Sequence, residues 1–255
     1  MSRCLIIVTL LLTILYRQSS GEDKEYLFVV GGPPNTYMTE IVSLTEGESI
    51  PDCLNALSDH PNDVRFGAGG ALPDASYQPH ICGSYVSPNN ECWAYTPSDD
   101  TWTKKSTIPR DFVSGGSAFH PGWGIIMSGG FVTNEVTVTK DGVEFEQLEP
   151  VGDIYYSYFH CIAAVNSSML FTTGLGSNDD ESYMYYKDTK EWVSLPNMPT
   201  RREGMGCGVV RDENGKIEVV VVGGKNHDTP VNTVEVFNVA ENSWRTGEFF
   251  KQYFK

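Results

Sequence analysis

The chain has 255 residues, and its 18 Lys and Arg against 33 Asp and Glu give a formal net charge of −15 at pH 7. A protein that binds nucleic acid through phosphates needs clustered basic side chains, whereas the basic pairs here, Lys104-Lys105 and Arg201-Arg202, are isolated. The same imbalance disfavours adsorption to anionic membranes. We therefore expect no nucleic-acid partner, and we interpret the acidity as a solvated surface.

The first element is an apolar N-terminal segment. Residues 4–15 form an apolar run between Arg3 and a polar stretch that ends at Gly21, which is the layout of a secretory signal peptide. The run is about twelve residues long, and a membrane-spanning helix needs roughly 20. We expect a signal peptide over 1–21 and a secreted mature chain over 22–255 with no membrane insertion after cleavage; a short signal anchor is the alternative.

Pairs of large apolar side chains seven positions apart recur along the mature chain. They are Tyr95 with Trp102, Tyr185 with Trp192, Phe237 with Trp244, and a weaker copy, Val138 with Phe145. The second members lie about 43 to 52 residues apart, and a period of this size indicates repeated blades or solenoid turns.

An apolar run that ends in glycine precedes each pair and begins the first repeat. The runs are "YLFVVGG", "HICGS", "WGIIMSGG", "MLFTTGLG" and "IEVVVVGG", and such runs predict strands. A run of small residues, such as "RFGAGGAL" or "GMGCGVV", precedes all but the first and predicts a closely packed inner strand. Each repeat therefore predicts four strands, which is typical of a propeller blade.

The glycine pairs and the aromatic pairs together resemble the Kelch repeat, and the resemblance covers nearly the whole mature chain. The residues that carry it are Gly31, Gly32, Gly129, Gly130, Gly223 and Gly224, with Tyr95, Trp102, Tyr185, Trp192, Phe237 and Trp244. The resemblance implies an all-β fold, a Kelch-type β-propeller of four-stranded blades. Glycine allows conformations and close approaches that a Cβ blocks, and the aromatic pairs are expected to pack between blades.

Five blades are visible, at about 26–61, 62–109, 110–151, 152–199 and 200–250. The first lacks an inner strand and an outer tryptophan. Either the C-terminal "FFKQYFK" supplies the missing strand, or the propeller is truncated from six blades. The tail contains none of the small residues of the other inner strands, which favours truncation.

Five cysteines remain after the signal peptide. Cys82 and Cys92 flank one hairpin, so we predict a disulfide between them. Cys161 and Cys207 fall on inner strands one alignment step apart, and one step reverses the face of a strand. We therefore expect two buried free thiols there, and we find no clear partner for Cys53.

A single glycosylation sequon, Asn166-Ser167-Ser168, falls at the predicted turn between "CIAAV" and "MLFTTG". A loop tip is a position where a glycan can be carried. We expect glycosylation at Asn166, in agreement with secretion.

Two enzyme classes compete with a binding role. A copper radical oxidase resembling the galactose oxidase family would need two His and two Tyr converging on copper, but the histidines, His60, His80, His120, His160 and His227, share no ligand spacing. A sugar isomerase resembling sialic acid mutarotase would draw on residues 201–203, which a loop salt-bridge cluster explains as well. No nucleophile elbow, Walker loop or dinucleotide fingerprint is present, so we expect no cofactor and no metal.

The loops between second and third strands share one face with the segments that join consecutive blades, and loops on a rigid scaffold commonly carry recognition. Arg65, Arg110 and Arg202 enter this face before inner strands. The Kelch resemblance implies contact with acidic or polar partner groups, for which the arginine fork is suited, although support of the loop through backbone carbonyls is equally compatible. Tyr155, Tyr156 and Tyr158 supply aromatic contact surface or pack between blades.

The sequence thus predicts a secreted, non-enzymatic Kelch-type module that binds an extracellular protein or glycan through these loops. A secreted Kelch-type enzyme, copper oxidase or sugar isomerase, is the competing hypothesis.

Overall fold

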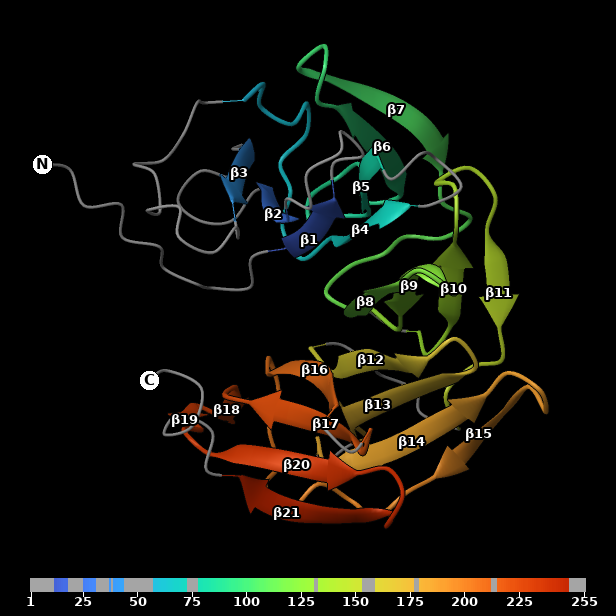
Figure 1. Ribbon diagram of the computed structural model, residues 1–255, viewed down its shortest axis with the longest axis vertical. Helices are drawn as coiled ribbons and strands as arrows, with labels where there is room; N and C mark the ends of the chain where they lie inside the picture. Colours follow the sequence, from blue (N-terminus) through green and yellow to red (C-terminus); the bar gives the residue numbers. More distant parts are fainter. Residues whose placement is uncertain are drawn as a thin grey trace, which may run out of the picture. The chain divides into compact units, whose positions relative to one another are not determined.

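The computed structural model describes residues 12–17, 25–30, 37, 39–43, 57–72, 78–130, 133–152, 159–176, 179–211 and 215–247 (Figure 1). Within these ranges the regular structure is entirely β, as the sequence predicted. The chain divides into two compact units, one of Met1–Ser114, Trp123–Ile126 and Val138–Glu146, the other of Gly115–Gly122, Met127–Thr137 and Gln147–Lys255. Each is described by itself.

Four-stranded antiparallel sheets in the described ranges correspond to the predicted blades. One has the order β4 (Ala68–Leu72), β5 (Gln78–Cys82), β6 (Glu91–Thr96), β7 (Thr101–Thr107). The next consists of β8 (Gly116–His120), β9 (Gly124–Ser128), β10 (Val136–Thr139) and β11 (Glu146–Leu148). A third consists of β12 (Cys161–Asn166), β13 (Met169–Leu175), β14 (Glu181–Tyr186) and β15 (Glu191–Ser194).

The last blade has the order β16 (Gly206–Arg211), β17 (Ile217–Val222), β20 (Val234–Asn238), β21 (Ser243–Gly247). A two-stranded hairpin, β18 (Lys225–Asn226) with β19 (Thr229–Pro230), is inserted between its second and third strands. Figure 1 shows this hairpin at one end of the blade, beside the end of β17 and the start of β20. In the described residues no other blade has a hairpin at this position.

The first sheet contains a strand that the sequence analysis did not expect. β1 (Leu12–Arg17) pairs with β2 (Glu25–Val30) from Leu12 opposite Val30 to Arg17 opposite Glu25, and β2 pairs with β3 (Thr39–Ser43). β1 takes the position of the inner strand and lies within the predicted signal peptide. The signal peptide and its cleavage near Gly21 stay a prediction.

The aromatic pairs of the repeat lie directly opposite each other on the two outer strands. Tyr95 faces Trp102, Tyr185 faces Trp192 and Phe237 faces Trp244, with ring centroids 5.2, 5.1 and 5.2 Å apart. Each indole N–H donates to a backbone carbonyl more than forty residues earlier in the chain, on Ser58, Glu149 and Pro196 respectively. The tryptophan therefore anchors the outer hairpin to the chain segment that arrives from the preceding repeat.

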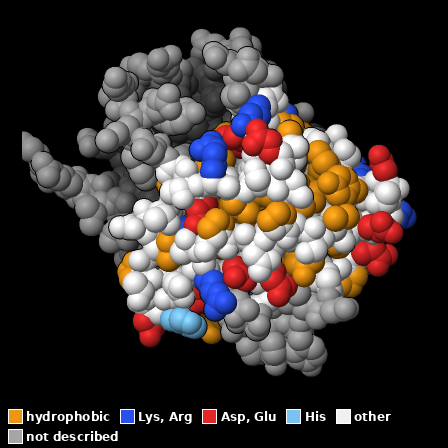
Figure 2. All heavy atoms as spheres, turned by 90° about the horizontal axis from the view of Figure 1, so that it is seen from below, with side chains coloured by type: hydrophobic (Ala, Val, Ile, Leu, Met, Phe, Trp, Pro, Cys, Tyr) orange, Lys and Arg blue, Asp and Glu red, His pale blue; other side chains and the backbone are white. Residues whose placement is uncertain are grey.

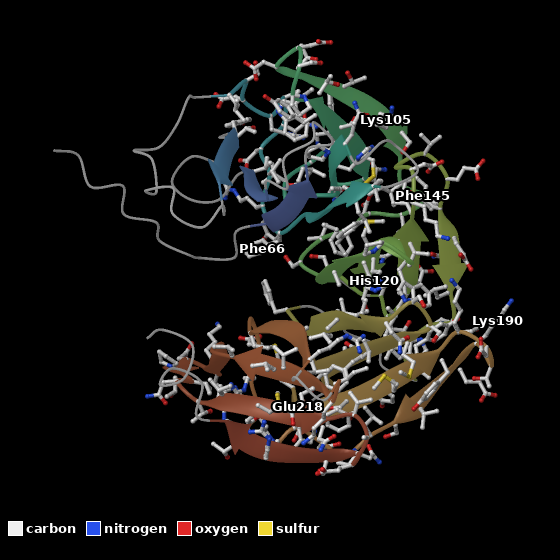
Figure 3. All side chains as sticks on the ribbon, in the orientation of Figure 1. Phe66, Lys105, His120, Phe145, Lys190 and Glu218 are labelled. Atoms are coloured by element: carbon white, nitrogen blue, oxygen red, sulfur yellow. A yellow bond between two sulfur atoms is a disulfide. The ribbon has the colours of Figure 1, made fainter. Side chains whose placement is uncertain are left out.

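A second repeated feature is a left-handed residue two positions before each inner strand from β4 onward. These residues are Phe66, Ser114, Phe159 and Gly204, with φ of 54°, 57°, 56° and 65°. Figure 3 labels Phe66 at its place before β4. A left-handed φ strains a bulky side chain and costs glycine little, so the last blade meets the requirement with the least strain.

The glycine pairs meet the same kind of requirement at the end of the second strand. Gly129 and Gly130 have φ of 64° and 125°, and Gly223 and Gly224 have φ of 68° and 84°. A Cβ on Gly224 would lie 2.7 Å from the carbonyl oxygen of Glu203, closer than real contacts allow. The pair Gly31-Gly32 lies outside the described residues.

Two disulfides join four of the cysteines. The Cys82–Cys92 bond is present as expected, across the β5–β6 pair with a Cα–Cα distance of 4.1 Å. The expectation of free thiols at Cys161 and Cys207 is wrong, because they form a second disulfide with a Cα–Cα distance of 6.0 Å. Cys53 lies outside the described residues.

The error at Cys161 and Cys207 has a geometric cause. The face of β12 that carries Cys161, Ala163 and Val165 packs on the face of β16 that carries Cys207 and Val209. Consecutive blades bring opposite faces together, so two equivalent strands meet through residues that are one alternation step out of phase. The one-residue offset between Cys161 and Cys207, from which free thiols were expected, is therefore the offset that a disulfide between neighbouring blades requires.

Candidate functional site

The segment that enters the last blade is joined to the β18–β19 hairpin by backbone hydrogen bonds. The amide of Glu203 donates to the carbonyl of Lys225 and the amide of Lys225 to the carbonyl of Glu203, both at 2.9 Å. The side chains of the same two residues form a salt bridge, with Lys225 Nζ 3.1 Å from Glu203 Oε1. In the β4–β7 blade the amide of Tyr85 donates in the same way to the carbonyl of Arg65 at 2.7 Å. The two kinds of loop that the sequence assigned to one face are therefore held together.

Arg202 lies behind this junction and is fully buried. Its guanidinium is 3.1 Å from Glu235 and donates to the carbonyls of Gly223 and Thr233 at 3.1 and 3.0 Å. Burial lowers the pKa of Arg202, and Glu235 opposes that shift. As a surface contact residue Arg202 is a wrong prediction; it supports the loop through backbone carbonyls, which was the alternative.

The three predicted arginines do not occupy equivalent positions, which explains their different surroundings. Relative to the left-handed residue of its blade, Arg65 lies one position before, Arg202 two before and Arg110 four before. In the β4–β7 and β8–β11 blades the positions that match Arg202 hold the buried apolar residues Val64 and Phe112, whereas Ser157, at the matching position of the β12–β15 blade, lies outside the described residues. Compared with these two blades, the last blade carries an arginine, paired with Glu235, in place of a buried apolar residue.

Arg65 and Arg110 remain at the surface. Arg65 is exposed and makes a double contact with Asp63, at 3.1 Å through Nε and 3.0 Å through Nη2. Arg110 is partly exposed, lies 5.6 Å from the centroid of the Phe112 ring and donates to the carbonyl of Asp111. Tyr155, Tyr156 and Tyr158 lie outside the described residues. The sequence reasoning passed over Tyr85, which is 55 % exposed beside Arg65.

An open groove of about 510 Å³ lies beside the β18–β19 hairpin; we call it the hairpin groove. It is lined by Thr200 from the entering segment and by residues 226–227 and 229–233 of the loop. The hydroxyls of Thr200 and Thr233 both contact the buried ion pair, since Thr200 Oγ1 donates to Glu235 and Arg202 Nη2 donates to Thr233 Oγ1 at 3.0 Å. The walls of the groove are consequently fixed by buried interactions, while residues 227–230 are exposed.

Charged side chains lie close to His227 of the groove. Burial raises the pKa of Asp179, and the charge of Glu203 adds to the shift while His227 opposes it. Arg201 lies 3.5 Å from Asp180, and the amide of Arg202 donates to the carbonyl of Asp179 at 3.1 Å. These contacts tie the loop of the preceding blade to the same entering segment.

The sequence signals for this groove were weak. Thr200 and Thr233 are common residue types in loops, and the loop 225–232 was placed on the correct face without any indication that it forms a hairpin. Only the length of the segment between Gly224 and Val234, compared with the other second-to-third-strand loops, could have singled it out.

The predicted glycosylation site lies in the β12–β13 turn. Asn166 Oδ1 accepts hydrogen bonds from the amide and the hydroxyl of Ser168 at 2.8 and 3.0 Å. Asn166 is partly exposed in this turn.

The histidines have separate surroundings. His60 packs edge-on against Trp93 and Trp102, and His80 is buried with its Nδ1 on the carbonyl of Gln78. His160 Nε2 lies 3.0 Å from Ser128 Oγ, His120 Nδ1 accepts from the amide of Gly122, and His227 is exposed in the hairpin groove. In the described part of the chain no three His, Cys, Asp or Glu side chains are grouped to hold a metal ion.

Figure 2 shows one face of the molecule, on which the Lys and Arg side chains are scattered among acidic and uncharged ones without forming a basic patch. A search of the described residues for a helix able to cross a membrane found none.

Comparisons with known proteins agree with the fold. The family model of the Kelch motif matches residues 218–248, which include β20 and β21 of the last blade. A search among curated proteins found no match. Among solved structures, a fungal alcohol oxidase of the AA5 family in complex with copper matches 92 % of this chain with 17 % sequence identity and a TM-score of 0.67. The match covers 52 % of that structure, so this chain spans about half its length. The Kelch motif in the last blade, the repeated four-stranded sheets and the similar fold of that structure agree with a Kelch-type β-propeller fold.

Proposed function

We propose that this protein is a secreted, non-enzymatic interaction module. It binds an extracellular protein or glycan through the loops between second and third strands and the segments that enter each blade. The hairpin groove is the part of this surface at which the geometry is best defined. Two disulfides support an oxidising compartment, where such bonds persist.

The observation that carries the proposal is the buried Arg202–Glu235 pair behind the groove. Replacing a buried ion pair by apolar residues is often neutral or stabilising, so such a pair is weak evidence of selection for stability. Here it fixes Thr200, Thr233 and the loop carbonyls, which belong to the exposed groove. A binding surface gains affinity when its groups are held in position before the partner arrives.

A binding screen with matched variants tests the proposal. Protein recovered from a secreting cell line is screened against extracellular proteins and glycans, and each hit is measured by titration. Thr229→Arg and Asn232→Arg place bulky charges in the groove and are expected to abolish binding. Thr246→Arg, on the exposed outer strand of the same blade, is the control and is expected to leave it unchanged. Hits that bind all variants equally would place the interaction elsewhere.

A copper oxidase is the second candidate, because the similar fold of the fungal alcohol oxidase belongs to a copper-bound enzyme. The histidine surroundings described above argue against it. The purified protein is incubated with Cu(II), desalted and assayed for bound copper and for hydrogen peroxide release from alcohols. We expect neither stoichiometric copper nor peroxide; one tightly held copper per chain with alcohol turnover would replace the binding hypothesis by an enzymatic one.

A further inference from the structure

The lining of the hairpin groove contains no Asp, Glu, Lys or Arg side chain among the described residues. Five of its side chains, those of Thr200, Thr229, Thr233, Asn226 and Asn232, carry a hydroxyl or an amide, and Pro230 and Val231 add a small apolar surface. Hydroxyls and amides offer both hydrogen-bond donors and acceptors. A charged partner group would find no opposite charge in this lining to compensate its desolvation.

The buried ion pair assigns a direction to two of the groove hydroxyls. The Glu235 carboxylate can only accept, so Thr200, which lines the groove, donates its hydroxyl hydrogen to Glu235 and can act toward a ligand only as an acceptor. The Arg202 guanidinium can only donate, so Thr233 Oγ1 accepts a hydrogen bond from Arg202, and its own hydrogen can be donated to a ligand. The groove therefore presents one oriented acceptor and one oriented donor.

A ligand hydroxyl is a chemical group that can bind both the acceptor on Thr200 and the donor on Thr233. Each hydroxyl can donate to Thr200 and accept from Thr233, and neighbouring hydroxyls on one ring can satisfy the two positions together. The C–H face of a sugar ring can lie on the apolar surface of Pro230 and Val231. A carboxylate, which only accepts, would satisfy Thr233 and leave Thr200 without a donor.

The charges around the groove further restrict the class of ligand that it can bind. Glu203, Asp179, Asp180 and Asp228 lie on the segments that border the groove, and the chain as a whole carries a formal charge of −15. Arg201 and Lys225 are engaged with Asp180 and Glu203. An anionic sugar would approach a negative surface, and no Lys or Arg lies among the described residues of the groove lining to pair with it.

We propose that the hairpin groove binds a neutral polyhydroxylated ligand, namely a residue of an uncharged glycan. The inference rests on the proposed function and specifies the class of partner at the same surface. Thr200 and Thr233 are its orienting contacts, and Arg202 with Glu235 are positioning residues that act through them.

The test uses the secreted full chain and immobilised neutral oligosaccharides ending in a hexose or an N-acetylhexosamine, with their sialylated counterparts for comparison. Affinity for a neutral probe is expected to be unchanged between about 0.05 and 0.5 M salt, because screening acts only on charges. Thr233→Val removes the oriented donor at nearly constant shape and is expected to weaken binding about fivefold. The matched control Thr246→Val is expected to bind as the unmodified protein does.

Because Thr233 also contacts Arg202, its variant is checked by thermal unfolding, and a second variant avoids that contact. Thr229→Trp fills the groove from an exposed position and is expected to abolish neutral-glycan binding at unchanged melting temperature. Stronger, salt-sensitive binding of the sialylated probes, or neutral binding that survives both groove variants, would overturn the proposal. A protein ligand lost in the groove variants, with no glycan bound, overturns this inference and leaves the proposed function standing. The absence of any ligand sensitive to the groove overturns both.

Discussion

The left-handed residue before each inner strand from β4 onward shows how one backbone requirement is met by three residue types, Phe, Ser and Gly. Gly204 and Gly206, two positions apart in the last blade, separate the effect of conformation from that of space. A Cβ at either position would meet no atom within 4 Å, but only Gly204 has a positive φ, of 65°.

We therefore predict that Gly204→Ala lowers the free energy of unfolding by about 1 kcal/mol, because an L side chain is strained in the left-handed region. Gly206→Ala is the control, and its effect is expected to be small or slightly stabilising since alanine restricts the unfolded chain. Urea unfolding of both variants measures the difference. Equal effects would mean that the strain of this position is negligible.

His60 predicts a pH dependence of stability. Burial lowers its pKa to about 4, against which the hydrogen bond to Asn62 and the charge of Glu91 act only weakly. The unfolded chain, with a pKa near 6.5, binds a proton that the folded state rejects between these two values. The free energy of unfolding is thus fully retained above about pH 6.5 and is lost as the pH falls toward 4.

The titration of His60 alone is expected to lower the free energy of unfolding by about 2 kcal/mol between pH 7 and pH 5. His60→Phe keeps a ring between Trp93 and Trp102 and removes the titration. The variant is expected to lose about 2 kcal/mol less than the unmodified protein over the same interval, as measured by urea unfolding at both pH values. Parallel curves for the two proteins would assign the pH dependence to the other histidines with lowered pKa, His80 and His120.

At the scale of elements, the two disulfides differ in what they connect. Cys82–Cys92 joins partners separated by 10 residues within one sheet, whereas Cys161–Cys207 joins residues 46 apart on the inner strands of neighbouring blades. A crosslink that closes a longer loop restricts the unfolded chain more.

Replacing Cys161 and Cys207 by alanine is therefore expected to cost about 4 kcal/mol of unfolding free energy, and replacing Cys82 and Cys92 about 3 kcal/mol. Equilibrium unfolding of the two double variants under non-reducing conditions provides the comparison. A larger loss for the Cys82–Cys92 pair would show that native packing, rather than loop closure, governs both bonds.

The elements that the sequence predicted are those encoded locally. The pairing of Tyr95 with Trp102 follows from seven-residue spacing around a tight turn, and the Gly223-Gly224 pair from a backbone that needs positive φ. The burial of Arg202 and the Cys161–Cys207 bond could not be predicted in the same way, because they depend on which faces of two neighbouring blades meet. The hairpin groove depends on hydrogen bonds between residues 31 and 35 positions apart, which no local sequence pattern indicates.

At the scale of the whole molecule, the predicted secretion has a direct test. Intact and peptide mass spectrometry of the protein from a secreting cell line is expected to show a start near Glu22 and a glycan on Asn166. Asn166→Gln is expected to remove the glycan and leave the start unchanged. A retained N-terminus with free thiols would instead indicate a reducing compartment and intracellular partners.

Strand β1 gives that start position a structural meaning. The six backbone pairs from Leu12–Val30 to Arg17–Glu25 and a cleavage near Gly21 exclude each other, because cleavage removes one partner of every pair. A processed chain would leave one side of β2 with open amides and carbonyls, a surface to which another strand can add. If residues 12–17 are cleaved, they act only as an export signal; if they are retained, they cover the edge of β2. Slow amide exchange in residues 25–30 would indicate that they are retained.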